Sequence, residues 1–170
     1  MVQDALLKIV YGMYIITSRS DEKLNGMIAT TACQVTAEPM RMTVAIHKER
    51  LTHSLIVASK TFGVSVLSTD ADMSFIGRFG FKSGRDTEKL DGINYVLGQT
   101  GVPLITDNTI AVIESRVIAS MDAGTHTIFL GEVVDARILS EKTAMTYDYY
   151  QNVIKGKSPK NAPTYHAPAK

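Results

Sequence analysis

Residues 25–31, with the sequence NGMIATT, form the first segment whose residue types suggest a ligand site. Small side chains follow Asn25-Gly26, so a ligand could approach the backbone closely and exposed amides could contact the edge of a flat heterocycle. An ordinary hairpin turn followed by β-forming threonines explains the same residues. That second interpretation is favoured when the segment is considered alone.

Residues 47–53, with the sequence HKERLTH, combine cations with a hydroxyl group. Lys48, Arg50, Thr52 and His53 fall where a strand is expected to lead into a helix, and a helix N-terminus favours anions. A solvated turn in which Thr52 serves as a plain helix cap explains the segment equally well.

Residues 81–85, with the sequence FKSGR, place Lys82 and Arg85 on either side of Ser83-Gly84. Two cations and the intervening amides could converge on a phosphate. A charged surface loop is the favoured alternative for this segment alone.

Two single residues also have chemistry of interest. His126 starts a β segment just after a turn, where a half-exposed strand histidine is usual, although an imidazole there could also bond a ligand or titrate near pH 7. Cys33 is expected to be a small buried apolar residue rather than a reactive thiol.

Several common site types are absent from the sequence. The four histidines and Cys33 have no metal-ligand spacing, and no Gly-x-Ser-x-Gly elbow, P-loop or Gly-x-Gly-x-x-Gly fingerprint occurs. We therefore expect no metal site, and any nicotinamide must be bound without a Rossmann fold.

Composition indicates an ordinary globular protein. The chain has 170 residues, 45% apolar and 21% charged, with a net charge of +1, so we expect neither nucleic acid nor a membrane as partner. One cysteine, no signal peptide and no long apolar run lead us to expect a cytoplasmic protein.

The elements expected around these residues are mostly strands. We predict strands over 8–17, 27–36, 42–47, 62–67, 109–121 and 127–139, with a turn at Asn25-Gly26 and a hairpin turn at 122–125. Short helices are expected from Thr52, over 70–79, and over 143–155 with Thr143 as its cap. The proline-containing tail after Gly156 is expected to be extended or mobile unless it is tied down. The many strands point to a mainly-β barrel.

The order of the segments resembles the flavin-reductase-like family, whose fold is an FMN-binding split barrel. The chain is most similar to its small ferric reductases, flavoredoxins and the flavin domain of high-molecular-weight rubredoxin. The matching stretches, in family order, are YGMYIITS (11–18), NGMIATTACQVT (25–36), LTH (51–53), FGVSVL (62–67), FIGRFGFKSGRD (75–86), GTHTIFLGEVVDA (124–136) and GKSPKNAPTY (156–165). Family members often have Asn at the positions of Thr30 and His47.

The resemblance implies a Greek-key split β-barrel with a few flanking helices over residues 1–156 and an extended C-terminal tail over 157–170. It implies that His126 lies near the exposed face of the flavin ring as the catalytic residue. The backbone from 26 to 31 would line the ring, and Asn25 and Thr31 would help to hold its polar edge or the ribityl chain. Lys48, Thr52 and His53 would hold the phosphate, and Lys82 and Ser83 would close over it. The implied FMN-binding residues are Asn25, Gly26, Met27, Ile28, Ala29, Thr30, Thr31, Lys48, Thr52, His53, Phe81, Lys82 and Ser83.

The implied activity is that of an FMN-dependent NAD(P)H:flavin or ferric reductase, in which hydride passes from nicotinamide to FMN and electrons continue to an acceptor. NADH or NADPH is the implied donor. The alternative is a flavoredoxin-type electron-transfer flavoprotein that exchanges electrons with a rubredoxin or ferredoxin. A homodimer is implied in either case.

Overall fold

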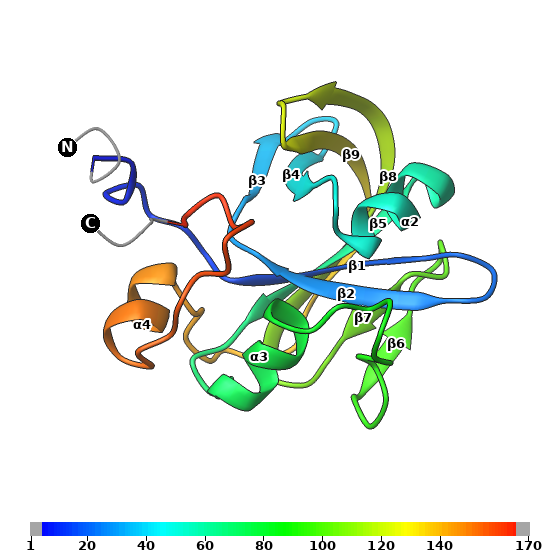
Figure 1. Cartoon of the computed structure of the whole chain (residues 1–170). Coiled ribbons are helices and arrows are strands. Elements are labelled where there is room, and N and C mark those ends of the chain that lie inside the picture. Colours follow the sequence, from blue (N-terminus) through cyan, green and yellow to red (C-terminus); the bar gives the residue numbers. More distant parts are fainter. Residues whose placement is uncertain (1–4, 166–170) are drawn as a thin grey trace.

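The computed structural model describes residues 5–165, in which strands predominate and short helices lie beside them (Figure 1). The mainly-β prediction is confirmed. The strands are β1 Tyr14–Arg19, β2 Leu24–Ala29, β3 Ala32–Thr36, β4 Arg41–His47, β5 Thr61–Leu67, β6 Tyr95–Leu97, β7 Pro103–Ile105, β8 Thr109–Asp122 and β9 His126–Ile138.

The larger sheet curls into a split barrel. Its seven antiparallel strands have the order β2-β1-β5-β8-β9-β4-β3, so β2 and β3 are its two outer strands. These outer strands are nevertheless consecutive in the chain, separated by Thr30 and Thr31. Because such a short link spans only roughly 10 Å, the sheet must bend until its edges meet at this corner. The predicted split barrel is thereby confirmed.

The β8–β9 hairpin occurs where the sequence predicts it. The amide of Ala123 donates to the carbonyl of His126 at 2.9 Å, and Gly124 takes a φ of 82°, which favours glycine. After this turn β9 pairs with β4, so that His126 lies opposite His47. The hairpin therefore determines where His126 stands.

The helices flank the barrel (Figure 1) and are α2 Leu51–Ser59, α3 Met73–Gly80 and α4 Tyr147–Asn152. Asp72 caps α3 by accepting from the Phe75 amide at 2.8 Å. Thr146, not the predicted Thr143, caps α4, and Thr52 is a buried residue inside α2 rather than its cap. No helix within residues 5–165 is long and apolar enough to cross a membrane.

Alternation along β1 divides the core into two clusters. Ile16 packs inside the barrel with residues such as Phe62 and Phe129, whereas Ile15 packs on the other face beneath α3 and α4 with Phe79. Helices α3 and α4 are thus held against the outer face of the sheet, beside the β2–β3 corner.

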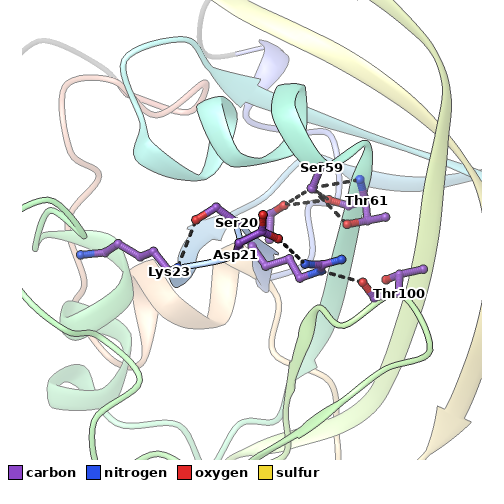
Figure 2. A network of polar contacts seen from close by, with 8 residues as sticks. Ser20, Asp21, Lys23, Ser59, Thr61 and Thr100 are labelled. Carbon is purple, nitrogen blue, oxygen red and sulfur yellow. Dashed lines mark hydrogen bonds and ion pairs between the residues drawn. The ribbon is translucent and has the colours of Figure 1, made fainter.

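A polar network fixes the β1–β2 hairpin against the α2–β5 connection (Figure 2). The Ser18 hydroxyl donates to the Thr61 carbonyl at 2.8 Å and also contacts the Ser59 hydroxyl. Arg19 Nε donates to the Thr100 carbonyl at 2.8 Å. The hairpin carries Asn25, so this network holds Asn25 at a fixed position relative to α2.

Three further local predictions are wrong. Asn25-Gly26 lies within β2, because the hairpin turn falls earlier, at Ser20–Lys23. The strand predicted over 27–36 is interrupted at residues 30–31, where the chain turns the barrel corner. Cys33 is exposed on outer strand β3, not buried.

Candidate functional site

A pocket opens over the corner between β2 and β3, and we call it the strand-corner pocket. Its floor is the run from Met27 to Thr31, as the sequence predicts for a ligand that approaches this backbone closely. Ala45 and His47 line it from β4, and Phe81 follows α3 at its rim. Most of the lining is apolar. The pocket therefore suits a flat, largely apolar group.

The C-terminal segment closes the far side of this pocket. Tyr150 Oη donates to the Lys157 carbonyl at 2.9 Å, and the hydroxyls of Tyr147 and Ser158 are hydrogen-bonded. Thr164 is buried. The segment is thus tied down by the tyrosines of α4, and the rest of the predicted tail, residues 166–170, lies outside the described residues.

A second, polar pocket continues from the first, and we call it the cationic pocket. Met27, Arg50 and Asn161 line both pockets, so the two form one elongated site. Four basic residues and one acidic residue, Glu49, contribute to the second lining. The lining comprises Asn25, Met27, Glu49, Arg50, Leu51, Thr52, Lys82, Ser83, Gly84, Arg85, Lys89 and Asn161.

Lys89 is the most deeply placed cation of this pocket. Its residue is 3% exposed, and Nζ donates to the carbonyls of Gly26 at 3.0 Å and Phe79 at 3.1 Å. Burial, with a smaller effect of nearby Arg50, lowers the pKa of Lys89 to about 8. A buried ammonium held only by neutral carbonyls is costly unless an anion joins it.

Arg50 lies where the two pockets meet. Its Nη2 donates to Asn161 Oδ1 at 2.6 Å, while its buried Nε has no hydrogen-bond partner among the described residues. Burial lowers the pKa of Arg50, although the guanidinium stays charged. Arg50 thus keeps a buried donor available to a ligand.

Asn25 and Thr52 form the wall between β2 and α2. Asn25 Nδ2 donates to the Thr52 hydroxyl at 2.8 Å, and within residues 5–165 the buried Asn25 Oδ1 accepts no hydrogen bond. Buried polar atoms rarely stay unpaired in proteins. The orphaned oxygen is therefore a point where a polar group of a ligand can bind.

His126 and His47 stand together at the mouth of the strand-corner pocket. Their ring centroids are 4.9 Å apart with planes at 79°. Burial, followed by the nearby His47, lowers the pKa of His126. His126 thus lies half-buried at the mouth of the strand-corner pocket.

Two of the predicted phosphate-binding residues lie outside both pocket linings. Lys48 Nζ pairs with Asp122 at 2.7 Å, and His53 Nε2 bonds the Thr127 hydroxyl at 2.8 Å. Gly26 contributes its carbonyl to Lys89 rather than a pocket surface. Its lack of a side chain serves packing, because a Cβ would lie 3.1 Å from Ile15 Cγ2.

Sequence reasoning missed some of the most central residues. Lys89 sits in a run of charged residues that reads as a solvated loop, and nothing local signals its burial. Arg50 is one of the cations of the 47–53 segment, but the resemblance does not include it among the FMN-binding residues. Tyr147 and Tyr150 reach the pocket only through the packing of α4 beside the corner.

The geometry joins an apolar slot to a cationic pocket in which Lys89 is buried and Arg50 is half-buried, and whose lining carries unpaired polar atoms. Such a site fits a flat heterocycle that carries an anionic chain. Charge-assisted hydrogen bonds from Arg and Lys favour phosphate as the anion.

Comparison with known proteins agrees with a site for such a ligand. The model of the flavin reductase like domain matches residues 6–157. The chain is 46% identical over 162 residues to the ferric-chelate reductase (NAD(P)H) of Archaeoglobus fulgidus, covering 95% of this chain and 96% of that one. It is 45% identical over 161 residues to the high molecular weight rubredoxin of Moorella thermoacetica, covering 95% of this chain and 70% of that protein.

A solved structure agrees in fold. The NADH:FAD oxidoreductase SgcE6 of Streptomyces globisporus superposes with a TM-score of 0.77 at 26% identity, covering 85% of this chain and 86% of that one. Fold, site and sequence similarity together lead to one conclusion: the chain belongs to the family of flavin reductase like domains.

Proposed function

We propose that this protein is an FMN-dependent oxidoreductase that is reduced by NADH or NADPH and passes electrons to flavin or to ferric iron. The observation that carries the proposal is the elongated site, in which the slot over Met27–Thr31 leads to two cations, the half-buried Arg50 and the buried Lys89. The NAD(P)H-dependent ferric-chelate reductase with 46% identity supports the same activity.

The residues of the site fit FMN. Asn25 and Arg50 both line the cationic pocket, and their buried atoms Asn25 Oδ1 and Arg50 Nε, which have no hydrogen-bond partner among the described residues, offer an acceptor and a donor. The terminal phosphate of FMN would offset the positive charge of Arg50 and Lys89. A ligand without an anionic group would leave these buried charges uncompensated.

In this proposal each group of residues has one task. The backbone of 27–31 and Phe81 hold the ring, Asn25 and Thr52 hold the polyol chain, and Arg50, Lys82, Ser83 and Lys89 hold the phosphate. When bound, FMN supplies the redox chemistry, taking a hydride from the nicotinamide and releasing electrons to the acceptor. His126 positions the second substrate over the ring.

Two parts of the proposal concern partners. We infer a homodimer from the family resemblance. Candidate contact surfaces are β3 and the hairpin end of β8, which expose the apolar residues Val35, Ile118 and Met121. A second candidate function, electron transfer with a rubredoxin-type protein, is favoured by the 45% identity to the high molecular weight rubredoxin.

Anaerobic mixing separates the two functions. We expect the FMN-loaded protein to lose its 450 nm-region absorbance rapidly when NADH or NADPH is added. Bleaching by reduced rubredoxin, but by neither nucleotide, would favour the electron-transfer function instead. A protein that binds no FMN would contradict both proposed functions.

A further inference from the structure

The mostly apolar lining of the strand-corner pocket contains a small set of hydroxyl groups. Four of them are hydrogen-bonded inside the protein, and these belong to Thr31, Tyr147, Tyr150 and Ser158. The other two, Thr30 Oγ1 and Thr164 Oγ1, are buried and have no hydrogen-bond partner among the described residues. Because buried polar atoms rarely stay unpaired, these two hydroxyls are points at which a ligand can supply the missing partner.

Thr30 and Thr164 reach the pocket from different parts of the chain. Thr30, 8% exposed, lies at the corner between β2 and β3 in the pocket floor, whereas Thr164, 4% exposed, lies in the C-terminal segment that closes the far side. Neither residue lines the cationic pocket, and neither lines the separate hollow to which His126 also contributes. Both hydroxyls therefore belong to the part of the site that suits a ring, away from its phosphate end.

The backbone holds Thr164 in place. After α4 the C-terminal segment returns to the β2–β3 corner (Figure 1). The Tyr165 amide donates to the Ala162 carbonyl at 3.0 Å, which closes a β-turn with Pro163 and Thr164 at its centre. Proline at the first central position restricts the backbone of such a turn. Just before it, Asn161 Oδ1 accepts from the guanidinium of the β4–α2 turn at 2.6 Å. Thr164 is thus fixed against the pocket before a ligand arrives.

The ring system of a flavin has two unlike edges. One edge is a dimethylbenzene ring and needs only apolar neighbours. The opposite edge carries carbonyl oxygens and an N–H group, which need hydrogen-bond partners when they are buried. A threonine hydroxyl can donate to a carbonyl oxygen or accept from an N–H group, so either atom type at this edge can pair with it. Two unpaired hydroxyls in an apolar slot therefore match the polar edge of the ring.

We propose that Thr164 is a flavin-binding residue whose hydroxyl bonds the polar edge of the ring, together with that of Thr30. The C-terminal segment is then part of the flavin site and not only its cover. The proposal rests on the proposed function, because it names a residue that holds the ring of the same cofactor. It adds to the FMN-binding residues that the resemblance implies, none of which comes from the C-terminal segment.

Thr164→Val tests the contact, because valine keeps the shape of the side chain and lacks the hydroxyl. We expect the affinity for FMN and that for riboflavin to fall by the same factor, about three- to tenfold, as for the loss of one neutral hydrogen bond. The ratio of the two affinities should stay at the wild-type value, because the two ligands share the ring. Fluorescence titrations with both flavins measure the ratio, and a changed ratio would place Thr164 at the phosphate end instead.

Two further variants serve as controls. Thr164→Ser retains the hydroxyl and should bind both flavins as the wild type does. Thr100→Val removes another buried threonine hydroxyl that has no partner among the described residues, but Thr100 lines neither the strand-corner pocket nor the cationic pocket. Its flavin affinities should be unchanged. An equal loss in Thr164→Val and Thr164→Ser would mean that packing, not the hydroxyl, is responsible.

Two other measurements separate a ligand contact from a purely structural role. Ligand-free Thr164→Val should unfold at a urea concentration no lower than that of the wild type, because the substitution removes an unpaired buried hydroxyl. In its complex with FMN, the infrared carbonyl bands of the flavin should move to higher frequency, as expected when a hydrogen bond to a carbonyl is lost. Unchanged bands would overturn the proposal.

The outcomes also distinguish this proposal from the proposed function. A wild-type protein that binds flavin, with a Thr164→Val variant that binds it equally tightly, would overturn only the role of Thr164. A wild-type protein that binds neither flavin would contradict the proposed function and the role of Thr164 with it.

Discussion

Arg50 Nη2 donates to Asn161 Oδ1 at 2.6 Å, joining the β4–α2 turn to the C-terminal segment at the point where both pockets meet. A neutral amide thus holds one half of a half-buried guanidinium, whose buried Nε has no hydrogen-bond partner among the described residues. This contact places the positive charge between the apolar slot and the cationic pocket, which is the position that an anion-bearing ring ligand requires.

Replacing Arg50 should therefore weaken FMN more than riboflavin, which lacks the phosphate. We expect Arg50→Ala to lower FMN affinity by about 1.5–3 kcal/mol, the usual loss for a hydrogen bond to a charged group. Isothermal titration with both flavins measures the difference. Lys48→Ala is the matched control, because its ammonium pairs with Asp122 outside the pockets and its loss should leave both affinities unchanged. Equal losses in the two variants would contradict the assignment.

Lys89 should make FMN binding weaken above about pH 8. Its pKa is lowered to about 8, and a bound phosphate would favour the charged form, so binding at higher pH requires proton uptake. We expect the affinity to fall by up to about tenfold per pH unit between pH 8 and 9.5, and Lys89→Gln to bind weakly with no such slope. An unchanged slope in Lys89→Gln would remove Lys89 from the site.

The lowered pKa of Lys89 also determines how the stability of the folded protein changes with pH. The lowered folded-state pKa means that the unfolded chain binds more protons from about pH 8 up to its ordinary value of 10.5. The contribution of Lys89 to the free energy of unfolding therefore rises with pH across that window. Urea titrations of ligand-free protein should show this rise, and Lys89→Met should lack it.

Gly84 should be intolerant of a side chain because of Asn25. A Cβ at Gly84 would lie 2.0 Å from Asn25 Oδ1, inside the wall of the cationic pocket. We expect Gly84→Ala to destabilise the protein by about 1–3 kcal/mol, as overpacking does, and to weaken FMN binding. Gly77→Ala in α3, whose added methyl would meet only Phe81 Cδ2 at 3.7 Å, should be neutral or stabilising. Denaturant unfolding compares the two, and comparable stabilities would refute the packing argument.

His126 should matter for reduction and not for flavin retention. It lines the mouth of the strand-corner pocket but not the cationic pocket. We expect His126→Ala to keep FMN and to be reduced by NADH roughly tenfold more slowly, since a misplaced second substrate reacts slowly. Stopped-flow absorbance measures this rate, and a wild-type rate would exclude His126 from positioning.

Local patterns predicted the elements that carry the site better than they predicted the site itself. The residue patterns were sufficient to predict strand β5 and the hairpin turn at 122–125. This hairpin determines the position of His126. The break at Thr30–Thr31 escaped notice because small and β-forming residues continue through it, and only closure of the barrel requires a corner there.

The burial of charged residues could not be predicted from local sequence patterns. Lys82, which lies in the predicted phosphate-binding segment, is exposed. Lys89 is buried because the chain after α3 returns against β2. Residues 157–164 are held against the pocket by the tyrosines of α4, although they are far in the sequence from the floor at residues 27–31. Such contacts depend on the whole topology, so no spacing along the chain could reveal them.

Fluorescence titration of the purified protein with FMN, compared with riboflavin, tests the central claim most directly. We expect each chain to bind one FMN, whose fluorescence is quenched on binding. Riboflavin should bind at least about tenfold more weakly, because it leaves Arg50 and Lys89 without a counter-charge. A protein that binds neither flavin, or binds both equally well, would contradict it.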